Sequence, residues 1–261
     1  GFFVREIKRH VNSYEYAFSR IGNMLVSRLF VSENFWSKHR MNKPIVAVFT
    51  SLLMIGSAPV WCANSPVGVN VAADMWLPST KIDNTRRDDA NSPVLNLAFE
   101  HQLPYLPNVS VRYTNLDADY ASYDKFDYTF YYNILERDLM TFDAGISMTQ
   151  YANSEYKATD GQKYSFDDLT FNWYASAEIS VPETNFDIIG QFEFGNSDGI
   201  KSSDVIAGVQ YVVPLAEGDL SFRGGYRVID LEFTDLATAS PNNKMSYVFA
   251  DGWFLGAQFT F

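Results

Sequence analysis

The sequence is poor in cysteine, with a single residue, Cys62, in 261. It lies at the edge of a short apolar segment that we expect to be removed. A chain without cysteine beyond this point has no disulfide, no thiolate metal site and no cysteine nucleophile. Packing and hydrogen bonds must therefore hold the exported fold together.

Long hydrophobic runs are also missing. The longest, Ile45 to Ile55 behind Lys43, is about eleven residues, whereas a transmembrane helix needs about 20. This length suits the core of a secretory signal peptide. We predict that Met41 is the initiator, that residues 41–63 form a signal peptide cut near Ala63, and that residues 64–261 are exported.

Positive charge is scarce in the exported part. Residues 64–261 contain 12 Lys and Arg against 28 Asp and Glu, a formal charge of −16. This balance argues against a nucleic-acid partner. Residues 1–40 are basic, and their apolar residues are spaced as on one face of a helix. Two hypotheses remain for them: upstream sequence that is not translated, or an amphipathic helix on a membrane surface.

The exported part shows a period of two, in which apolar and polar residues alternate. Mean hydropathy is only −0.15 although aromatic residues make up 16% of the chain, as expected for strands that are apolar on one face only. The pattern predicts ten strands. They cover residues 67–77, 95–99, 109–113, 126–134, 140–149, 169–179, 186–194, 204–213, 220–228 and 247–261.

Three features depart from the alternation. Asp251 falls on the apolar side of the last strand, near its outer end. After Val228 the apolar residues change parity, which predicts either a bulge or a strand that leaves the membrane. The pair Gly224 and Gly225 could mark a bulge or kink.

Most of these strands are long enough for the 9 to 11 residues that cross a bilayer at a tilt, and longer than soluble sandwich strands. In hydrocarbon all backbone groups must be paired, so the sheet must close. Long connections alternate with short ones, as in barrels with long outer loops and periplasmic termini. The predicted fold class is all-β: a transmembrane antiparallel up-and-down barrel of about ten strands in a bacterial outer membrane.

The last strand ends in DGWFLGAQFTF, with alternating aromatic residues and a terminal Phe. This resembles the C-terminal signature by which the outer-membrane assembly machinery recognises its clients. The matching residues are Tyr247, Phe249, Trp253, Phe259 and Phe261. The FRGGYR stretch, residues 222–227, is similar to a family of small gammaproteobacterial outer-membrane proteins with a Gly-Gly pair near the C-terminus. That resemblance implies location and fold, and no activity.

Several charged residues have the parity of the barrel interior. Unpaired charges are costly in a confined space, so we expect a network of ion pairs across the lumen. The predicted members are Arg112, Asp127, Asp143, Glu178, Asp187, Glu193, Arg223 and Arg227. Such a network favours a plugged barrel with a structural or surface role; the alternative is a narrow, cation-preferring pore.

An enzyme is the third and least favoured hypothesis. Omptin proteases, also ten-stranded barrels, need an Asp-His pair at the outer rim, and barrel phospholipases and lipid A acyltransferases need His with Ser. Of the three histidines, His10 and His39 precede the signal peptide and His101 lies in a predicted periplasmic turn. Asp167 and Asp168 are adjacent and do not form a dyad by spacing. We predict no catalytic residue, metal or cofactor.

The predicted outer loops are charged. Asp117, Asp119 and Asp124 lie in one of them, and Arg86 and Arg87 in another. They could bind divalent cations or lipopolysaccharide phosphates, although solvated loops are commonly charged as well. The expected partners are outer-membrane lipid, lipopolysaccharide and the assembly machinery. The sequence leaves the oligomeric state open.

Overall fold

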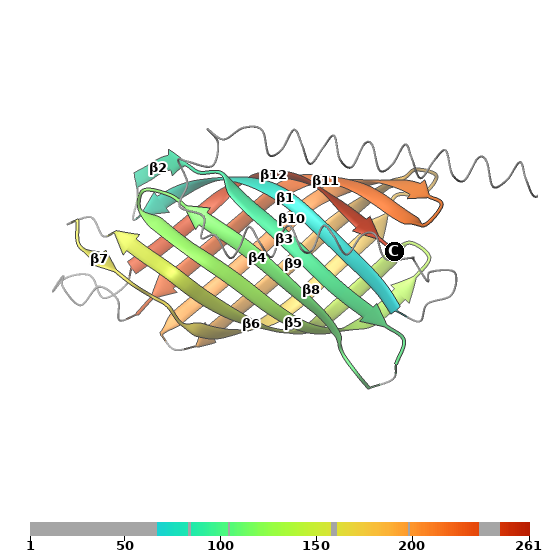
Figure 1. Ribbon diagram of the computed structural model, residues 1–261, viewed down its shortest axis with the longest axis horizontal. Helices are drawn as coiled ribbons and strands as arrows, with labels where there is room; N and C mark the ends of the chain where they lie inside the picture. The colour runs from blue at the N-terminus through green and yellow to red at the C-terminus, as the bar shows by residue number, and fades with distance from the viewer. Residues whose placement is uncertain (1–66, 83–84, 104, 158–160, 198, 235–245) are drawn as a thin grey trace, which may run out of the picture. The chain divides into compact units, whose positions relative to one another are not determined.

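The computed structural model describes residues 67–82, 85–103, 105–157, 161–197, 199–234 and 246–261. The predicted signal peptide and the segment before it lie outside these residues. Ten long strands and two short ones follow in chain order (Figure 1). They are β1 (Val67–Ile82), β2 (Thr85–Asp89), β3 (Ser92–His101), β4 (Asn108–Asp117), β5 (Ala121–Arg137), β6 (Met140–Lys157), β7 (Lys163–Tyr164), β8 (Leu169–Ser180), β9 (Phe186–Ser197), β10 (Ile200–Leu215), β11 (Gly218–Phe233) and β12 (Ser246–Thr260). Among the described residues no helix is long and apolar enough to cross a membrane.

The ten long strands form a closed antiparallel barrel in which each strand pairs with the next along the chain. The barrel closes where β12 pairs with β1, from Asn70 opposite Thr260 to Ile82 opposite Val248. Short β2 pairs with β1, and β7 with β6. The predicted ten-stranded, up-and-down barrel is therefore confirmed.

The two ends of the barrel differ. The terminal rim contains the start of β1, the end of β12 and the turns after β3, β5, β8 and β10 (Figure 1, right). The loop rim is the opposite end, where β2 and β7 lie (Figure 1, left). Both names are used below.

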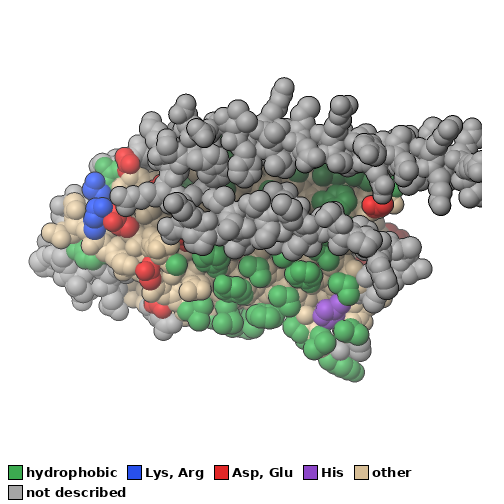
Figure 2. Space-filling view, viewed as in Figure 1, with side chains coloured by type: hydrophobic (Ala, Val, Ile, Leu, Met, Phe, Trp, Pro, Cys, Tyr) green, Lys and Arg blue, Asp and Glu red, His purple; other side chains and the backbone are tan. Residues whose placement is uncertain are grey.

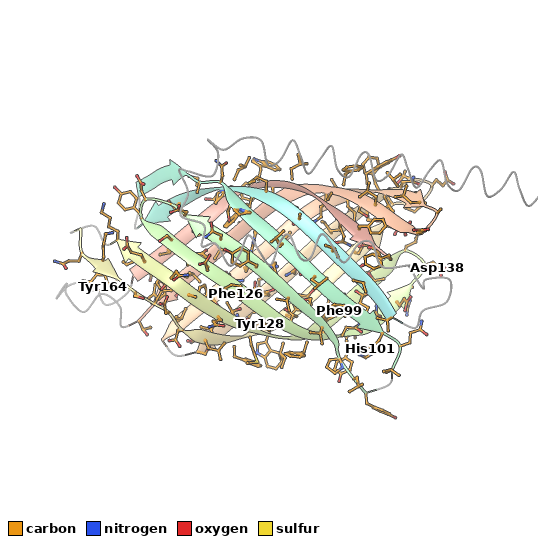
Figure 3. The ribbon with its side chains drawn as sticks, viewed as in Figure 1. Phe99, His101, Phe126, Tyr128, Asp138 and Tyr164 are labelled. Carbon is orange, nitrogen blue, oxygen red and sulfur yellow. The ribbon has the colours of Figure 1, made fainter. Side chains whose placement is uncertain are left out.

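Large apolar side chains cover the outer wall of the barrel. On β12, for example, Trp253 and Leu255 point outward and are 68% and 72% exposed. Figure 2 shows hydrophobic side chains across the middle of the barrel, with charged ones gathered near the loop rim. Phe99, Phe126 and Tyr128 lie on this wall (Figure 3). An exposed apolar belt of this extent is rare on soluble monomers and suits a lipid environment.

Towards the loop rim, the polarity of the two faces is reversed. On β11, Ile229, Leu231 and Phe233 point inward and are buried, whereas Asp230 and Glu232 point outward. The register with β10 and β12 runs without a shift through this region. The change of parity after Val228 is thus no bulge. The strand continues beyond the apolar belt with its apolar side chains packed inside, as in a water-soluble barrel.

The bulge considered at Gly224 and Gly225 is not present. Both residues lie in continuous register, and Gly225 has a packing reason to be glycine. A Cβ atom there would lie 2.2 Å from the Ala207 carbonyl oxygen and 2.5 Å from Gly208 Cα. Gly225 therefore permits a close approach between β11 and β10.

Two of the predicted long loops are mostly strand. β4 and β5 are joined by a turn of residues 118–120, in which Ala118 N donates to Ala121 O at 3.1 Å. β9 and β10 are joined by residues 198–199, with Gly199 at φ 79°. The charged segments expected in solvent instead extend the barrel wall, which brings Lys125 inside it.

Candidate functional site: an ion-pair network across the lumen

Arg112 on β4 connects three strands across the lumen. Its Nε donates to Asp127 Oδ2 on β5 at 3.0 Å. Its Nη2 donates to Glu193 Oε1 on β9 at 2.7 Å and to Asp204 Oδ2 on β10 at 3.1 Å. One guanidinium thus bonds carboxylates from three strands, which its fork of five N–H donors permits.

Lys125 on β5 is the second cation of the network. Its Nζ lies 2.7 Å from both oxygens of Asp127 and 2.9 Å from Asp204 Oδ2. The Oε2 atom of Glu193 is 3.5 Å away, and it receives no hydrogen bond from the described residues. The ammonium group therefore contacts the same three carboxylates as Arg112.

Arg227 on β11 completes the network. Its Nε and Nη2 donate to the two oxygens of Asp204 at 2.9 and 2.7 Å. Its Nη1 donates to Thr114 Oγ1 at 3.1 Å, and the guanidinium lies 5.0 Å from the centre of the Trp76 ring. A cation over an indole face adds electrostatic attraction to the ion pair.

The network is balanced in charge and closed to solvent. It contains three cations and three carboxylates, and none of the six side chains is more than 7% exposed. Removing one partner from such a group leaves an uncompensated buried charge, which costs about 3 to 5 kcal/mol. The network therefore ties five strands together across the lumen.

The three carboxylates also have the spacing of a cation site. One oxygen from each of Asp127, Glu193 and Asp204 can be chosen so that all lie within 4.8 Å of one another, and oxygen donors suit a hard divalent cation. Lys125 Nζ lies within 3.5 Å of all three groups. Lys125, Arg112 and Arg227 thus neutralise the three carboxylates. These residues therefore do not fit an additional metal ion.

Apolar side chains fill the barrel on the loop-rim side of the network. Trp76, Leu116, Tyr123 and Tyr151 are almost fully buried there, together with the inward residues of β11. Tyr123 and Tyr151 pack edge to face at 5.7 Å, and Phe166 packs against both rings and against Phe233. This apolar layer and the ion-pair network lie one after the other along the lumen.

On the terminal-rim side of the network lies a cavity of about 600 Å³. It extends from Arg112 and Glu193 to exposed residues of the rim such as Glu136 and Asp219. Its wall is rich in carboxylates. The lumen is therefore hollow on the terminal-rim side of the network.

Three predicted network members lie in this half, away from the six-membered group. Asp143 accepts a hydrogen bond from Ser176 at 2.9 Å, and Gln210 Nε2 donates to both Glu178 (2.9 Å) and Asp187 (3.1 Å). None of the three has an ion-pair partner among the described residues. The expectation that all inward charges would pair is wrong for them, because neutral donors satisfy these carboxylates.

Arg223, another predicted member, forms a separate pair. Its Nε lies 3.4 Å from Asp74 Oδ1, and its Nη1 donates to Gln258 Oε1 at 3.0 Å. The structure thus brings together four of the predicted residues, Arg112, Asp127, Glu193 and Arg227. It adds two residues that the sequence reasoning left out, Lys125 and Asp204.

Both omitted residues carried a signal. Lys125 has the inward parity of Asp127 and lies one residue before the predicted strand 126–134. Asp204 has the inward parity of Gln210 and is the first residue of the predicted strand 204–213. Extending the first strand by one residue includes Lys125, and counting the inward charges of the second from its first residue includes Asp204.

The predicted assembly residues share the outer face of β12. Tyr247, Trp253 and Phe261 are exposed, and Phe259 and Phe261 pack at 5.5 Å. Phe261 extends the seam beyond β12, since its N donates to Val69 O at 3.0 Å and its O accepts from Val69 N at 2.8 Å. Asp251 also points outward, as predicted, and accepts a hydrogen bond from the Tyr226 hydroxyl.

The remaining acidic candidates have structural partners. Asp167 Oδ1 accepts from Ser154 N at 2.7 Å and Asp168 Oδ1 from Leu169 N at 2.8 Å, so this pair caps backbone groups. Asp124 accepts from Tyr113, Asn115 and Asn153. It lies on the wall, and so does Asp117, instead of in a loop. The side chains of Arg86 and Arg87 are outside what the structure describes.

No protein-family model and no curated protein sequence match the chain. Three solved structures illustrate what the chain is similar to. The beta domain of the Bordetella autotransporter BrkA is 14% identical, with 75% of this chain and 99% of that chain covered and a TM-score of 0.39. Neisserial surface protein A is 13% identical (76% and 98% covered, TM-score 0.35), and the outer-membrane protease OmpT of Escherichia coli is 10% identical (78% and 99% covered, TM-score 0.38).

Proposed function

We propose that the protein is an integral outer-membrane barrel with a closed lumen and a structural or surface role. The terminal rim faces the periplasm and the loop rim faces outward. The apolar belt on the outer wall supports a lipid environment. The reversed polarity near the loop rim supports a barrel that projects beyond the membrane into water.

The ion-pair network is the observation that most supports a closed lumen. Arg112 alone reaches from β4 to β5, β9 and β10, so a solute would have to break several buried ion pairs to pass. It would then meet the apolar layer of Trp76, Leu116 and the inward aromatic residues. Ten strands leave a narrow interior, which side chains of this size can fill.

A narrow cation-preferring pore is the second candidate. The acidic cavity favours it, because Glu100, Asp143 and Glu178 line that space with only neutral donors bound to them. In this alternative the network would be a gate that opens, and the carboxylates would select cations. Both candidates share the same membrane barrel.

Catalysis is not part of the proposal. His101 is the histidine within the described residues, and its ring nitrogens face Leu103 N and Pro107 O at 3.2 Å. Both ring nitrogens are therefore engaged within the turn, which does not support a role as a general base. We further propose outer-membrane lipid and lipopolysaccharide as surroundings of the belt, and recognition of the β12 aromatic residues by the assembly machinery.

Ion flux through liposomes tests the proposal. The protein is refolded into vesicles loaded with potassium, and folding is checked by its heat-modifiable mobility on gels. We expect no potassium release beyond that of empty vesicles. Release by folded protein would contradict the closed lumen and favour the pore.

A further inference from the structure

The turn between β3 and β4 differs from the other turns of the terminal rim. Leu103, Tyr105 and Leu106 are 59%, 94% and 55% exposed. Its sequence, QLPYLP at residues 102–107, has no charged residue. The other three turns of this rim contain Asp138, Glu183 and Glu217. We call Leu103, Tyr105 and Leu106 the apolar turn.

Hydrogen bonds from His101 and Asn108 hold the apolar turn in place. His101 N donates to Asn108 Oδ1 at 2.9 Å, which closes the base of the turn. Leu103 N donates to His101 Nδ1 at 3.2 Å, and His101 Nε2 lies 3.2 Å from Pro107 O. The two ring nitrogens therefore bridge the start and the end of the turn. These hydrogen bonds tie Leu103 and Pro107 to the ends of β3 and β4.

Tyr105 adopts a backbone conformation that is unfavourable for an aromatic residue. Its φ is 69°, in the left-handed region that Gly and Asn occupy most easily. Residues held in this region are concentrated at functional sites. The ring that this strained residue carries makes little contact with the protein.

The apolar turn continues the lipid-facing wall. On β5, Tyr132 and Ile134 point outward beyond the start of β4, and the Tyr132 hydroxyl donates to Tyr105 O at 3.1 Å. Phe99 on β3 lies on the same wall (Figure 3). Figure 2 shows hydrophobic side chains around the purple histidine, adjoining those of the wall. The turn is thus an extension of the belt at its terminal edge.

We propose that the apolar turn inserts into the headgroup region of the periplasmic leaflet and anchors the barrel to the lipid surface. This rests on the proposed membrane location. Tyr prefers the interface, where its ring is in contact with acyl chains and its hydroxyl with water. An uncharged turn can enter this layer without desolvating an ion, whereas turns with Asp138 or Glu183 remain in water.

Site-directed fluorescence tests the proposal on the full chain with Cys62→Ser. Single cysteines replace Tyr105, Leu255 as a belt control and Glu183 as a control in a charged turn. Each is labelled with an environment-sensitive dye and refolded into vesicles of phosphatidylcholine and phosphatidylglycerol. Two quenchers are compared: aqueous iodide and a lipid with a nitroxide near its headgroup. We expect iodide to quench the probe at Tyr105 as weakly as it quenches the probe at Leu255. We also expect the nitroxide lipid to quench the probe at Tyr105.

Three results would overturn the proposal, each in a different way. A Tyr105 probe as open to iodide as Glu183, with Leu255 still quenched by lipid, places the turn in water and leaves the proposed function intact. A Tyr105 probe shielded from both quenchers indicates a protein contact instead of lipid. If the Leu255 probe is not quenched by lipid, the membrane location itself fails.

A second variant distinguishes the effect of the Tyr105 ring from that of the backbone conformation. Tyr105→Asn suits the left-handed conformation better and removes the aromatic anchor. With the dye at Leu106→Cys, we expect Tyr105→Asn to increase iodide quenching while the heat-modifiable mobility shift stays the same. An unchanged Leu106 signal would contradict an anchoring role for the ring.

Discussion

Arg227 on β11 and Asp204 on β10 are diagonal neighbours inside the barrel, joined by two hydrogen bonds of 2.9 and 2.7 Å. Asp204 also accepts from Arg112 and Lys125, so one carboxylate meets all three cations of the network. Its position makes Asp204 the central acceptor of the lumen.

Replacing Arg227 with methionine should lower the free energy of unfolding by about 3 to 5 kcal/mol, because buried Asp204 loses its bidentate partner. Urea unfolding in vesicles, followed by tryptophan fluorescence, measures this. Lys201→Met is the matched control, since its ion pair with Glu232 is solvent-exposed and such pairs contribute about 0 to 1 kcal/mol. Equal effects at both positions would contradict a buried network.

The double variant Arg227→Met with Asp204→Leu should be more stable than the sum of the single effects predicts. The two residues contact each other, and the second change removes the negative charge that the first left uncompensated within the buried network. We expect a coupling energy of about 0.5 to 3 kcal/mol from the double-mutant cycle. Additive effects would show that the two side chains act independently.

Neutralising a carboxylate outside the network and one inside it should change the free energy of unfolding in opposite directions. Glu178 and Asp187 share the Gln210 amide and have no ion-pair partner among the described residues, so Glu178→Gln should raise the unfolding free energy by roughly 0.2 to 1 kcal/mol. Asp127→Asn removes the partner of Lys125 and Arg112 and should lower it by about 3 to 5 kcal/mol. The same urea titration measures both, and a loss of stability in Glu178→Gln would indicate an undetected cation partner.

The period of two predicted the barrel, its ten strands and the inward parity of Arg112 and Asp127. It could not predict which charged side chains form ion pairs. Parity tells which face of a strand a residue lies on, but its position along the barrel axis depends on how neighbouring strands are staggered. Asp143 and Asp127 share the inward parity, yet Asp127 lies in the network and Asp143 near the terminal rim. Lys125 was missed for a further reason: beyond the belt the polarity of the faces reverses, so the pattern no longer resembles a membrane strand.

The inward apolar residues near the loop rim should matter as much as a soluble core. Leu231 is fully buried, and Leu231→Ala should cost about 2 to 5 kcal/mol, as large-to-small changes in cores do. Outward Glu232→Ala on the same strand should cost less than about 1 kcal/mol, because its ion pair is exposed. Thermal unfolding of the two variants, measured side by side, compares them directly, and similar losses would contradict an apolar layer there.

The closed lumen is tested most directly by single-channel recording in planar bilayers with folded wild-type protein and the Arg112→Ala variant. We predict a silent bilayer for the wild type. The variant, which loses contacts to Asp127, Glu193 and Asp204 together, should show cation-selective steps or leak. Steady, cation-selective steps from the folded wild type would contradict the closed barrel and assign the acidic cavity to a pore.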